Sequence, residues 1–365
     1  MAGHVINYYA GGNTAIGFYS LYDSNLQGLD RLFILKGGPG TGKSSLMRKI
    51  GQNWMENGYD IELLHCSSDN NSIDGVIIPE LKVGVVDGTA PHVIEPKAPG
   101  AIEDYVNLGQ AWNSRQLAEY KNEIVSCTAK ISEAFQAAYF IFAQALRIHD
   151  EWERIYISNM DFVQADRHTE ELIEKFIGEK TLKKNADVKH RFFGAATPNG
   201  AVDFIQNLTE NIPKRYFIKG RPGTGKSTLL KKLAAKAEQA GFDVEIYHCG
   251  FDPNSLDMVT MRELGIVVFD STAPHEYFPD RDTDEIIDVY KTVITAGTDE
   301  KYAAQINDIT QRYSAKMAEA TSHLAMAKSL HDDLEKFYIG AMDFAKVEQL
   351  RQAIDSEIAQ IAGSI

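Results

Sequence analysis

The sequence repeats itself at an offset of 183 residues, and each copy contains a glycine-rich loop of one specific pattern. At this offset residues 31–92 align with residues 214–275 without a gap, and about 28 of the 62 pairs are identical. Self-similarity over so long a stretch indicates two copies of one domain. We therefore expect two tandem domains, residues 1–185 and 186–365, that meet in the polar stretch 178–187.

Three sequence blocks carry the repeat, and shorter matches lie further along the chain. The blocks are Lys-Gly-x-Pro-Gly-Thr-Gly-Lys-Ser at 36–44 and 219–227, His-Cys-x-x-Asp-x-Asn-Ser-x-Asp at 65–74 and 248–257, and Asp-x-Thr-Ala-Pro-His at 87–92 and 270–275. Further along, His149-Asp150 and Glu153 recur as His331-Asp332 and Glu335. The likeness therefore covers whole domains rather than the glycine-rich loops alone.

The first block has the sequence context of a turn between a buried strand and a helix. A short apolar run precedes it, at 32–35 and 216–218, and a helix is predicted after it, at 44–57 and 227–240. Gly58 and Gly241 then end the predicted helices. Further strands are expected at 60–66, 83–86 and their counterparts. Strands that alternate with helices predict an α/β fold with a parallel sheet in each domain.

The last third of each repeat, about 113–177 and 298–361, has apolar residues at helical spacing. Leu117, Tyr120, Ile124 and Ile131 recur at three, four or seven residues. This spacing predicts a long helical hairpin that extends from each core. Packing against the core explains such a stripe, and a coiled-coil contact with a partner protein is the alternative.

The glycine-rich loops match Gly-x-x-x-x-Gly-Lys-Ser, the pattern of a phosphate-binding P-loop. Backbone N–H groups cradle phosphate oxygens, the lysine adds a positive charge, and the helix N-terminus favours an anion. The sequence therefore predicts two tandem P-loop NTPase domains that bind a nucleoside triphosphate, with ATP favoured. The predicted nucleotide-binding residues are Gly37, Gly38, Pro39, Gly40, Thr41, Gly42, Lys43, Ser44, Ser45, Gly220, Arg221, Pro222, Gly223, Thr224, Gly225, Lys226, Ser227 and Thr228.

A magnesium ion is the expected companion of the triphosphate. Ser44 and Ser227 offer hydroxyl ligands directly after the P-loop lysines Lys43 and Lys226. The carboxylates of the Mg²⁺ site are predicted at the ends of later apolar strands, where an aspartate holds the metal in P-loop enzymes. These carboxylates belong to Asp87 and Asp270. The alternative for each is a strand-end aspartate that caps a turn.

The residue that would activate water is not evident. Many ATPases have a glutamate directly after the strand-end aspartate, but Gly88 and Ser271 stand there. Asp69 and Asp252 are the favoured catalytic candidates besides the two lysines, because they follow strands at the edge where such sheets bind ligands. Capping of a polar turn is the alternative for both. Three other duplicated pairs stay open: Asp74/Asp257, Glu80/Glu263 and His92/His275.

Composition limits the partners. The net charge of −14 argues against a broad surface for nucleic acid or for an anionic membrane. Three cysteines make a poor disulfide framework, and neither a signal peptide nor a membrane span is visible in the sequence. We expect a cytoplasmic protein.

The three duplicated blocks together resemble a bacterial family of tandem P-loop proteins that are usually labelled ATP-binding proteins or putative ATPases. The resemblance covers essentially the whole chain and implies ATP binding and a P-loop NTPase fold, but no substrate. Neither the Asn-Lys-x-Asp of Ras-type GTPases nor the Leu-Ser-Gly-Gly-Gln of ABC ATPases occurs. Arsenite-pump ATPases also carry two P-loops, but theirs have a shorter Lys-Gly-Gly-x-Gly-Lys-Thr form.

Three functions fit these features. The leading hypothesis is a Mg²⁺-dependent ATPase in which hydrolysis at one or both sites changes the arrangement of two pseudo-symmetric domains. The second is a kinase for a nucleotide or small molecule, suggested by the missing glutamate. The third is an ATP sensor or scaffold that does not hydrolyse and that acts through its helices. Nucleic-acid handling has one local support, the basic stretch 180–191, which also suits a solvated linker.

Overall fold

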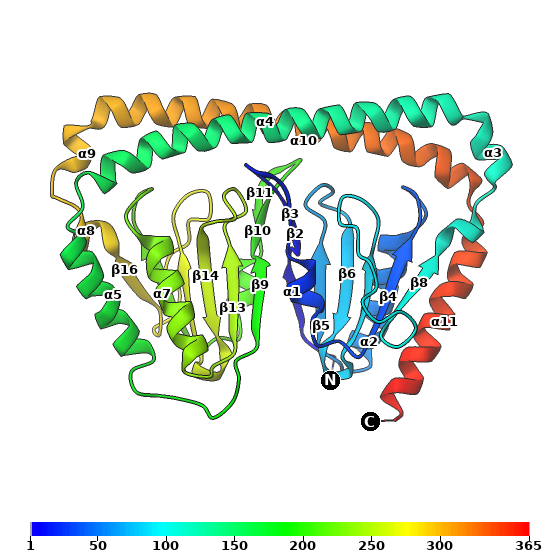
Figure 1. Ribbon diagram of the computed structural model, residues 1–365, viewed down its shortest axis with the longest axis horizontal. Coiled ribbons are helices and arrows are strands. Elements are labelled where there is room, and N and C mark those ends of the chain that lie inside the picture. Colours follow the sequence, from blue (N-terminus) through cyan, green and yellow to red (C-terminus); the bar gives the residue numbers. More distant parts are fainter. Residues whose placement is uncertain (1, 365) are drawn as a thin grey trace.

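The computed structural model describes residues 2–364, in which two similar α/β cores lie side by side beneath a pair of long helices (Figure 1). We call residues 4–112 core 1 and residues 188–297 core 2. We call helices α4 and α5 arm 1, and helices α10 and α11 arm 2. The two arms connect the cores. No helix among residues 2–364 is both long enough and apolar enough to cross a membrane.

Core 1 contains a six-stranded sheet of order β1-β5-β6-β7-β4-β8. Its strands are β1 (Val5–Tyr8), β4 (Arg31–Lys36), β5 (Ile61–His65), β6 (Ile73–Ile78), β7 (Val83–Asp87) and β8 (Glu103–Asn107). The remaining elements are the hairpin β2 (Gly11–Thr14) and β3 (Gly17–Ser20), helices α1 (Tyr22–Leu26) and α2 (Lys43–Glu56), and the 3₁₀ turns η1 (Pro79–Leu81) and η2 (Leu108–Ala111). Helix α3 (Ser114–Glu119) leads into arm 1.

Core 2 repeats this plan with the strand order β16-β12-β15-β14-β13-β9. Its strands are β9 (Val188–Phe192), β12 (Lys214–Lys219), β13 (Val244–His248), β14 (Leu256–Met261), β15 (Ile266–Asp270) and β16 (Glu285–Asp288). The remaining elements are the hairpin β10 (Gly194–Thr197) and β11 (Gly200–Asp203), helices α6 (Ile205–Thr209), α7 (Lys226–Gln239) and α8 (Val289–Val293), and turn η3 (Arg262–Leu264). Helix α9 (Thr298–Lys301) leads into arm 2.

The structure confirms the predicted α/β class and the two similar domains, but the predicted parallel sheets are wrong. Both sheets are mixed, because β6 runs antiparallel to β5 and β7, and β14 runs antiparallel to β13 and β15. Only residues 66–72 join β5 to β6. A parallel connection needs a dozen or more residues, so this short link forces an antiparallel strand.

The predicted helical hairpin on each core is also wrong. Helices α4 (Lys121–Ile157) and α10 (Ala303–Ala341) pack along each other across both cores, so each long helix pairs with its counterpart in the other arm (Figure 1). At about 1.5 Å per residue such helices exceed 50 Å in length, enough to reach from one core to the other. The apolar stripe predicted the helices, but it did not identify their partner.

The shorter arm helices complete an exchange between the two units. Helix α5 (Phe162–Phe176) packs against α7 and α8 of core 2, although it continues the first repeat. Helix α11 (Phe344–Ala362) packs against α2 and η2 of core 1. Trp54 of α2 shares one apolar cluster with Ile354 and Ile358 of α11. Each core is therefore covered by the arm of the other repeat.

The two cores also contact each other directly. The edge strands β1 and β9 face one another, and Tyr9 and Phe192 exchange backbone hydrogen bonds of 2.9 and 3.0 Å. A single apolar cluster includes Tyr8 and Leu64 of core 1 and Phe217 of core 2. The two cores therefore share part of one hydrophobic interior.

Candidate functional site

Each core has a glycine-rich loop between a buried strand and a helix, as the sequence predicts. Loop 1 (residues 37–42) joins β4 to α2, and loop 2 (residues 220–225) joins β12 to α7. Gly40 and Gly42 have φ values of 65° and 87°, and Gly223 and Gly225 have 74° and 87°. These are left-handed conformations that side chains disfavour, so the pattern requires glycine there. Each loop thus delivers its backbone to a helix N-terminus, where anions are favoured.

The lysine at each helix start folds back over its loop. Lys43 Nζ donates to the carbonyl oxygens of Gly38 at 2.8 Å and Gly37 at 3.2 Å. Lys226 Nζ donates to the Arg221 carbonyl at 2.9 Å. Both lysines are mostly buried, and each is close to the predicted metal-site aspartate of its own core: Lys43 Nζ to Asp87 Oδ2 is 3.5 Å, and Lys226 Nζ to Asp270 Oδ2 is 3.4 Å.

The predicted metal-site aspartates divide their two oxygens between the turn and the lysine. Asp87 Oδ1 accepts hydrogen bonds from the Thr89 amide at 2.9 Å and the Thr89 hydroxyl at 2.6 Å, which leaves Oδ2 directed to the lysine. Asp270 repeats this with Thr272. The structure therefore gives each carboxylate a turn-capping role and a position beside the loop lysine at the same time.

The predicted metal-site serines lie one residue after the lysines. Ser44 Oγ accepts from the Ile73 amide at 3.0 Å, and Ser227 Oγ accepts from the Leu256 amide at 3.0 Å. These bonds tie the first turn of α2 to β6 and the first turn of α7 to β14. Hydroxyl and carboxylate oxygens are the donor set that suits Mg²⁺, so the side chains present at each loop fit that ion.

The favoured catalytic aspartates have turn-capping partners in the structure. Asp69 accepts from the Asn71 amide at 2.9 Å through Oδ1 and from Ser72 Oγ at 3.0 Å through Oδ2. Asp252 makes the same two contacts, with the Asn254 amide at 3.1 Å and Ser255 Oγ at 3.1 Å. Both aspartates therefore cap polar turns, which is the alternative to a catalytic role that the sequence left open.

The open candidates Asp74 and His92 form a buried pair in core 1. Asp74 Oδ2 lies 3.4 Å from His92 Nε2 and accepts from the Tyr22 hydroxyl at 3.1 Å. Burial opposes the charge on His92, but the facing Asp74 carboxylate outweighs it and raises the pKa of His92 to about 9. The imidazole is therefore held as a cation next to a carboxylate.

Core 2 arranges the equivalent residues differently. His275 Nδ1 lies 2.7 Å from Asp203 Oδ2 in β11, where core 1 has Ser20 at the equivalent position. Burial and the nearby Asp270 carboxylate raise the pKa of Asp257 to about 6. The two sites therefore differ in the carboxylate that faces the histidine, although their loops are alike.

Arg221, the residue that distinguishes loop 2 from loop 1, is directed toward the start of arm 2. Its Nη2 is 3.1 Å from Asp299 Oδ2 in α9, and its guanidinium carbon lies 5.2 Å from the centre of the Tyr290 ring. In loop 1 the corresponding Gly38 lets Tyr338 of α10 approach closely. The two loops therefore contact the helical layer in different ways.

Sequence reasoning missed the residues that the arms bring to the loops. Glu335 of α10 accepts a hydrogen bond from the Gly40 amide through Oε1 at 3.2 Å, and Glu153 of α4 packs on Gly223 of loop 2. Beside these lie His331 and Asp332 at one loop and His149 and Asp150 at the other, each set within 4.8 Å of its glutamate. The duplication of these residues was the only signal, and it did not reveal that each set lies on the other core.

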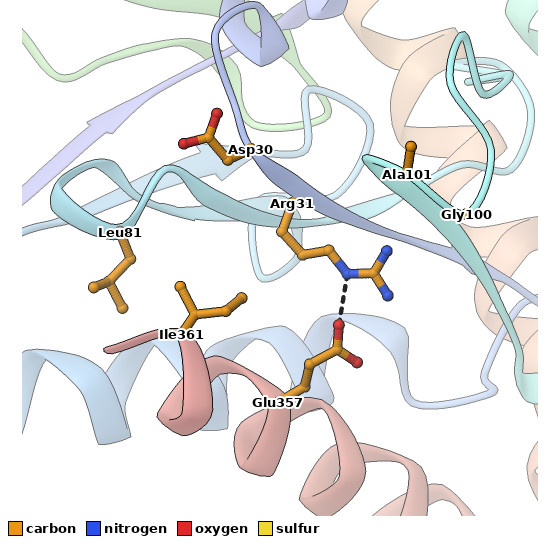
Figure 2. A pocket seen from close by; sticks show the side chains of 7 residues that line it. All are labelled: Asp30, Arg31, Leu81, Gly100, Ala101, Glu357 and Ile361. Carbon is orange, nitrogen blue, oxygen red and sulfur yellow. Dashed lines mark hydrogen bonds and ion pairs between the residues drawn. The ribbon is translucent and has the colours of Figure 1, made fainter. Parts of the chain in front are cut away.

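The open hollow beside β4 lies at the end of the strand opposite to loop 1. It has a volume of about 400 Å³ and includes Arg31, Leu81, Gly100 and Ile361. Figure 2 shows the Arg31 guanidinium directed at Glu357 of α11, with Nε 2.6 Å from the carboxylate. This contact holds α11 on core 1, so the hollow belongs to the docking of arm 2 rather than to the loop.

Comparisons of the chain with protein-family models, with curated proteins and with solved structures found no significant match.

Proposed function

We propose that the protein binds ATP with Mg²⁺ at both glycine-rich loops, as a tandem P-loop NTPase, and that it hydrolyses the nucleotide. The observation that carries this proposal is the same arrangement in both cores: strand, left-handed glycines, helix N-terminus, and a lysine within 3.5 Å of a strand-end aspartate. Backbone amides and the lysine suit the phosphates, and the hydroxyl and carboxylate oxygens suit the metal.

The contacts between arms and loops support a mechanical consequence. Glu335 reaches the Gly40 amide, and Glu153 lies against Gly223, so a triphosphate in either loop meets a carboxylate from the helical layer. Like charges repel, and the arms have to adjust when the γ-phosphate arrives or leaves. Nucleotide turnover would thus change how the long helices sit on the cores.

The test is ATP binding and hydrolysis by Lys43→Ala, Lys226→Ala and the double variant. Each loses charged contacts to phosphate that are typically worth about 1.5–3 kcal/mol, which is roughly ten- to a hundredfold in affinity at that site. Lys49→Ala and Lys232→Ala are matched controls, because these exposed lysines occupy equivalent positions on α2 and α7. Hydrolysis that persists in the double variant would refute the proposal, and tight binding with no ADP formed would leave an ATP sensor.

A further inference from the structure

The favoured candidates for water activation within each core are poorly placed to activate water. Gly88 and Ser271 follow the strand-end aspartates, so no glutamate stands at that position. Asp69 and Asp252 use both carboxylate oxygens in their turns. A general base has to reach the reacting water directly, and carboxylates fixed in turns are poorly placed for it.

The arms bring a glutamate to each loop from the other repeat. Glu335 Oε1 is 3.2 Å from the amide nitrogen of Gly40, 295 residues earlier in the chain. The backbone of α10 also lies close to loop 1 at this point. A Cβ built on Gly40 would lie only 2.9 Å from the Glu335 carbonyl oxygen. In loop 2, a Cβ on Gly223 would lie 2.6 Å from the Glu153 carbonyl oxygen. Both glutamates therefore lie on a loop whose amides are proposed to hold phosphate.

A histidine one turn earlier accompanies each glutamate. His331 Nδ1 is 3.7 Å from Glu335 Oε1, and His149 Nδ1 is 3.8 Å from Glu153 Oε1. Because residues at i and i+4 share one face of a helix, each histidine lies on the same helix face as its glutamate. In the second site, burial and the nearby Asp150 and Asp252 carboxylates raise the pKa of Glu153, which suits a group that must accept a proton.

We propose that the two sites are composite, with Glu335 as the general base of the loop 1 site and Glu153 as that of the loop 2 site. This inference rests on the proposed ATPase function. The glutamate carboxylate takes a proton from water while the water oxygen forms a bond to the γ-phosphorus. The bond from that phosphorus to the β–γ bridging oxygen breaks, and ADP leaves with the electron pair. The glutamate then returns its proton to solvent, and His331 or His149 positions the carboxylate.

The crossed arrangement makes a specific experiment possible. Lys43→Ala removes the loop 1 site and leaves the loop 2 site, which depends on Glu153. Adding Glu335→Gln to Lys43→Ala should therefore leave the remaining ATPase rate unchanged. Adding Glu153→Gln to Lys43→Ala should lower it by about 10²–10⁴-fold, the usual contribution of a general base. With Lys226→Ala the roles reverse, and Glu335→Gln becomes the damaging change.

Binding and folding are measured on the same variants. We expect the glutamine variants to keep their ATP affinity or to bind more tightly, because an anionic neighbour of the triphosphate is gone. Asp333→Asn and Glu133→Gln are controls, since both are exposed carboxylates on the same helices, α10 and α4. Where one lysine substitution alone abolishes turnover, ATP affinity replaces rate: in Lys226→Ala, only Glu335→Gln should tighten the remaining site.

The outcomes separate the inference from the function beneath it. The reverse pattern, with each glutamate serving the loop of its own repeat, overturns the composite sites. Unchanged turnover in the Glu153→Gln/Glu335→Gln double variant also overturns them, and so does a wild-type protein that binds ATP without hydrolysing it. A wild-type protein that does not bind ATP refutes the proposed function itself.

Discussion

Lys43 and Asp87 form a mostly buried ion pair, with 3.5 Å between Nζ and Oδ2, at the point where β7 ends beside loop 1. The lysine comes from the helix that follows the loop, and the aspartate comes from a neighbouring strand in the sheet. The repeat of this pair as Lys226 and Asp270 places one positive and one negative group at each loop. A bound triphosphate is stabilised by a positive group such as the lysine, and its metal ion by a negative group such as the aspartate.

Asp87→Asn should therefore weaken the metal dependence of the loop 1 site. In the Lys226→Ala background, which isolates that site, we expect the Mg²⁺ concentration for half-maximal ATPase to rise about 10–100-fold, the usual effect of losing a carboxylate that orients a metal. The comparison is Asp104→Asn, an exposed carboxylate in β8. If both variants have the same Mg²⁺ dependence, Asp87 acts only as a turn cap.

A second prediction concerns the interface between the cores. Arg191 of β9 is 3% exposed, and its Nη2 lies 2.9 and 3.1 Å from the two carboxylate oxygens of Glu62 in β5. Its guanidinium also lies over the Tyr8 ring at 4.2 Å. Arg191→Met leaves Glu62 buried without its cation, so we expect a loss of about 3–5 kcal/mol in unfolding free energy, measured by urea titration.

The control for the interface is an exposed ion pair. Arg312 of α10 contacts Glu151 of α4 at 2.7 Å and Asp308 at 2.8 Å in solvent. Arg312→Met should cost no more than about 1 kcal/mol, because water screens such pairs. Equal losses for Arg191→Met and Arg312→Met would show that the core interface does not depend on the buried arginine.

Local sequence was enough to predict the strand–loop–helix units, because short-range rules govern them. The backbone at positions 40 and 42 is left-handed, which favours glycine, and the sequence pattern around Lys43 has glycine at both positions. The exchange of the arms could not be predicted in this way. Packing against its own core, against α10 or against another protein would bury the apolar face of α4 equally well. The local sequence therefore does not identify the partner.

The role of Glu335 was hidden for the same reason. Its contact with Gly40 joins positions 295 residues apart, and only the path of α10 brings them together. The antiparallel direction of β6 was accessible in principle, since residues 66–72 are too few for a crossover. Local patterns thus revealed what each loop requires, and the long-range packing determined which side chains meet there.

A third prediction tests the contact between arm 1 and loop 2. Gly223 has φ 74°, and a Cβ there would lie 2.6 Å from the Glu153 carbonyl oxygen and 2.9 Å from its Cα. Gly223→Ala should force α4 away from the loop, at a cost of about 1–3 kcal/mol beyond the backbone strain. Amide hydrogen exchange around residue 153 should become faster, and the urea midpoint should fall.

Gly100→Ala separates strain from collision. Gly100 has a similar φ of 78°, but a Cβ there meets nothing within 4 Å. The Gly100→Ala variant therefore has the energetic cost of a left-handed alanine, about 1–2 kcal/mol, but does not displace another element. Equal exchange rates around residue 153 in the two variants would contradict close docking of α4 on loop 2.

The fourth prediction is a pH dependence that comes from the His92–Asp74 pair. The facing carboxylate raises the pKa of His92 to about 9 in the folded protein despite burial, whereas the unfolded chain has a value near 6.5. A raised folded-state pKa means that this stabilisation is complete below pH 6.5 and is lost as the pH rises through about 9. Between these limits the contribution falls by about 1.4 kcal/mol per pH unit at most.

His92→Gln removes the titrating group and should reveal the effect as a difference. Urea unfolding of both proteins from pH 6 to pH 10 should show the largest gap near pH 6, and the gap should shrink toward pH 9 and above. His4→Gln serves as the control, because His4 faces its carboxylate partner Glu210 in an exposed pair, at 3.7 Å, rather than in a buried one. A gap that stays constant with pH would mean that His92 is neutral in the folded protein, and that Asp74 is stabilised by the Tyr22 hydroxyl rather than by a cation.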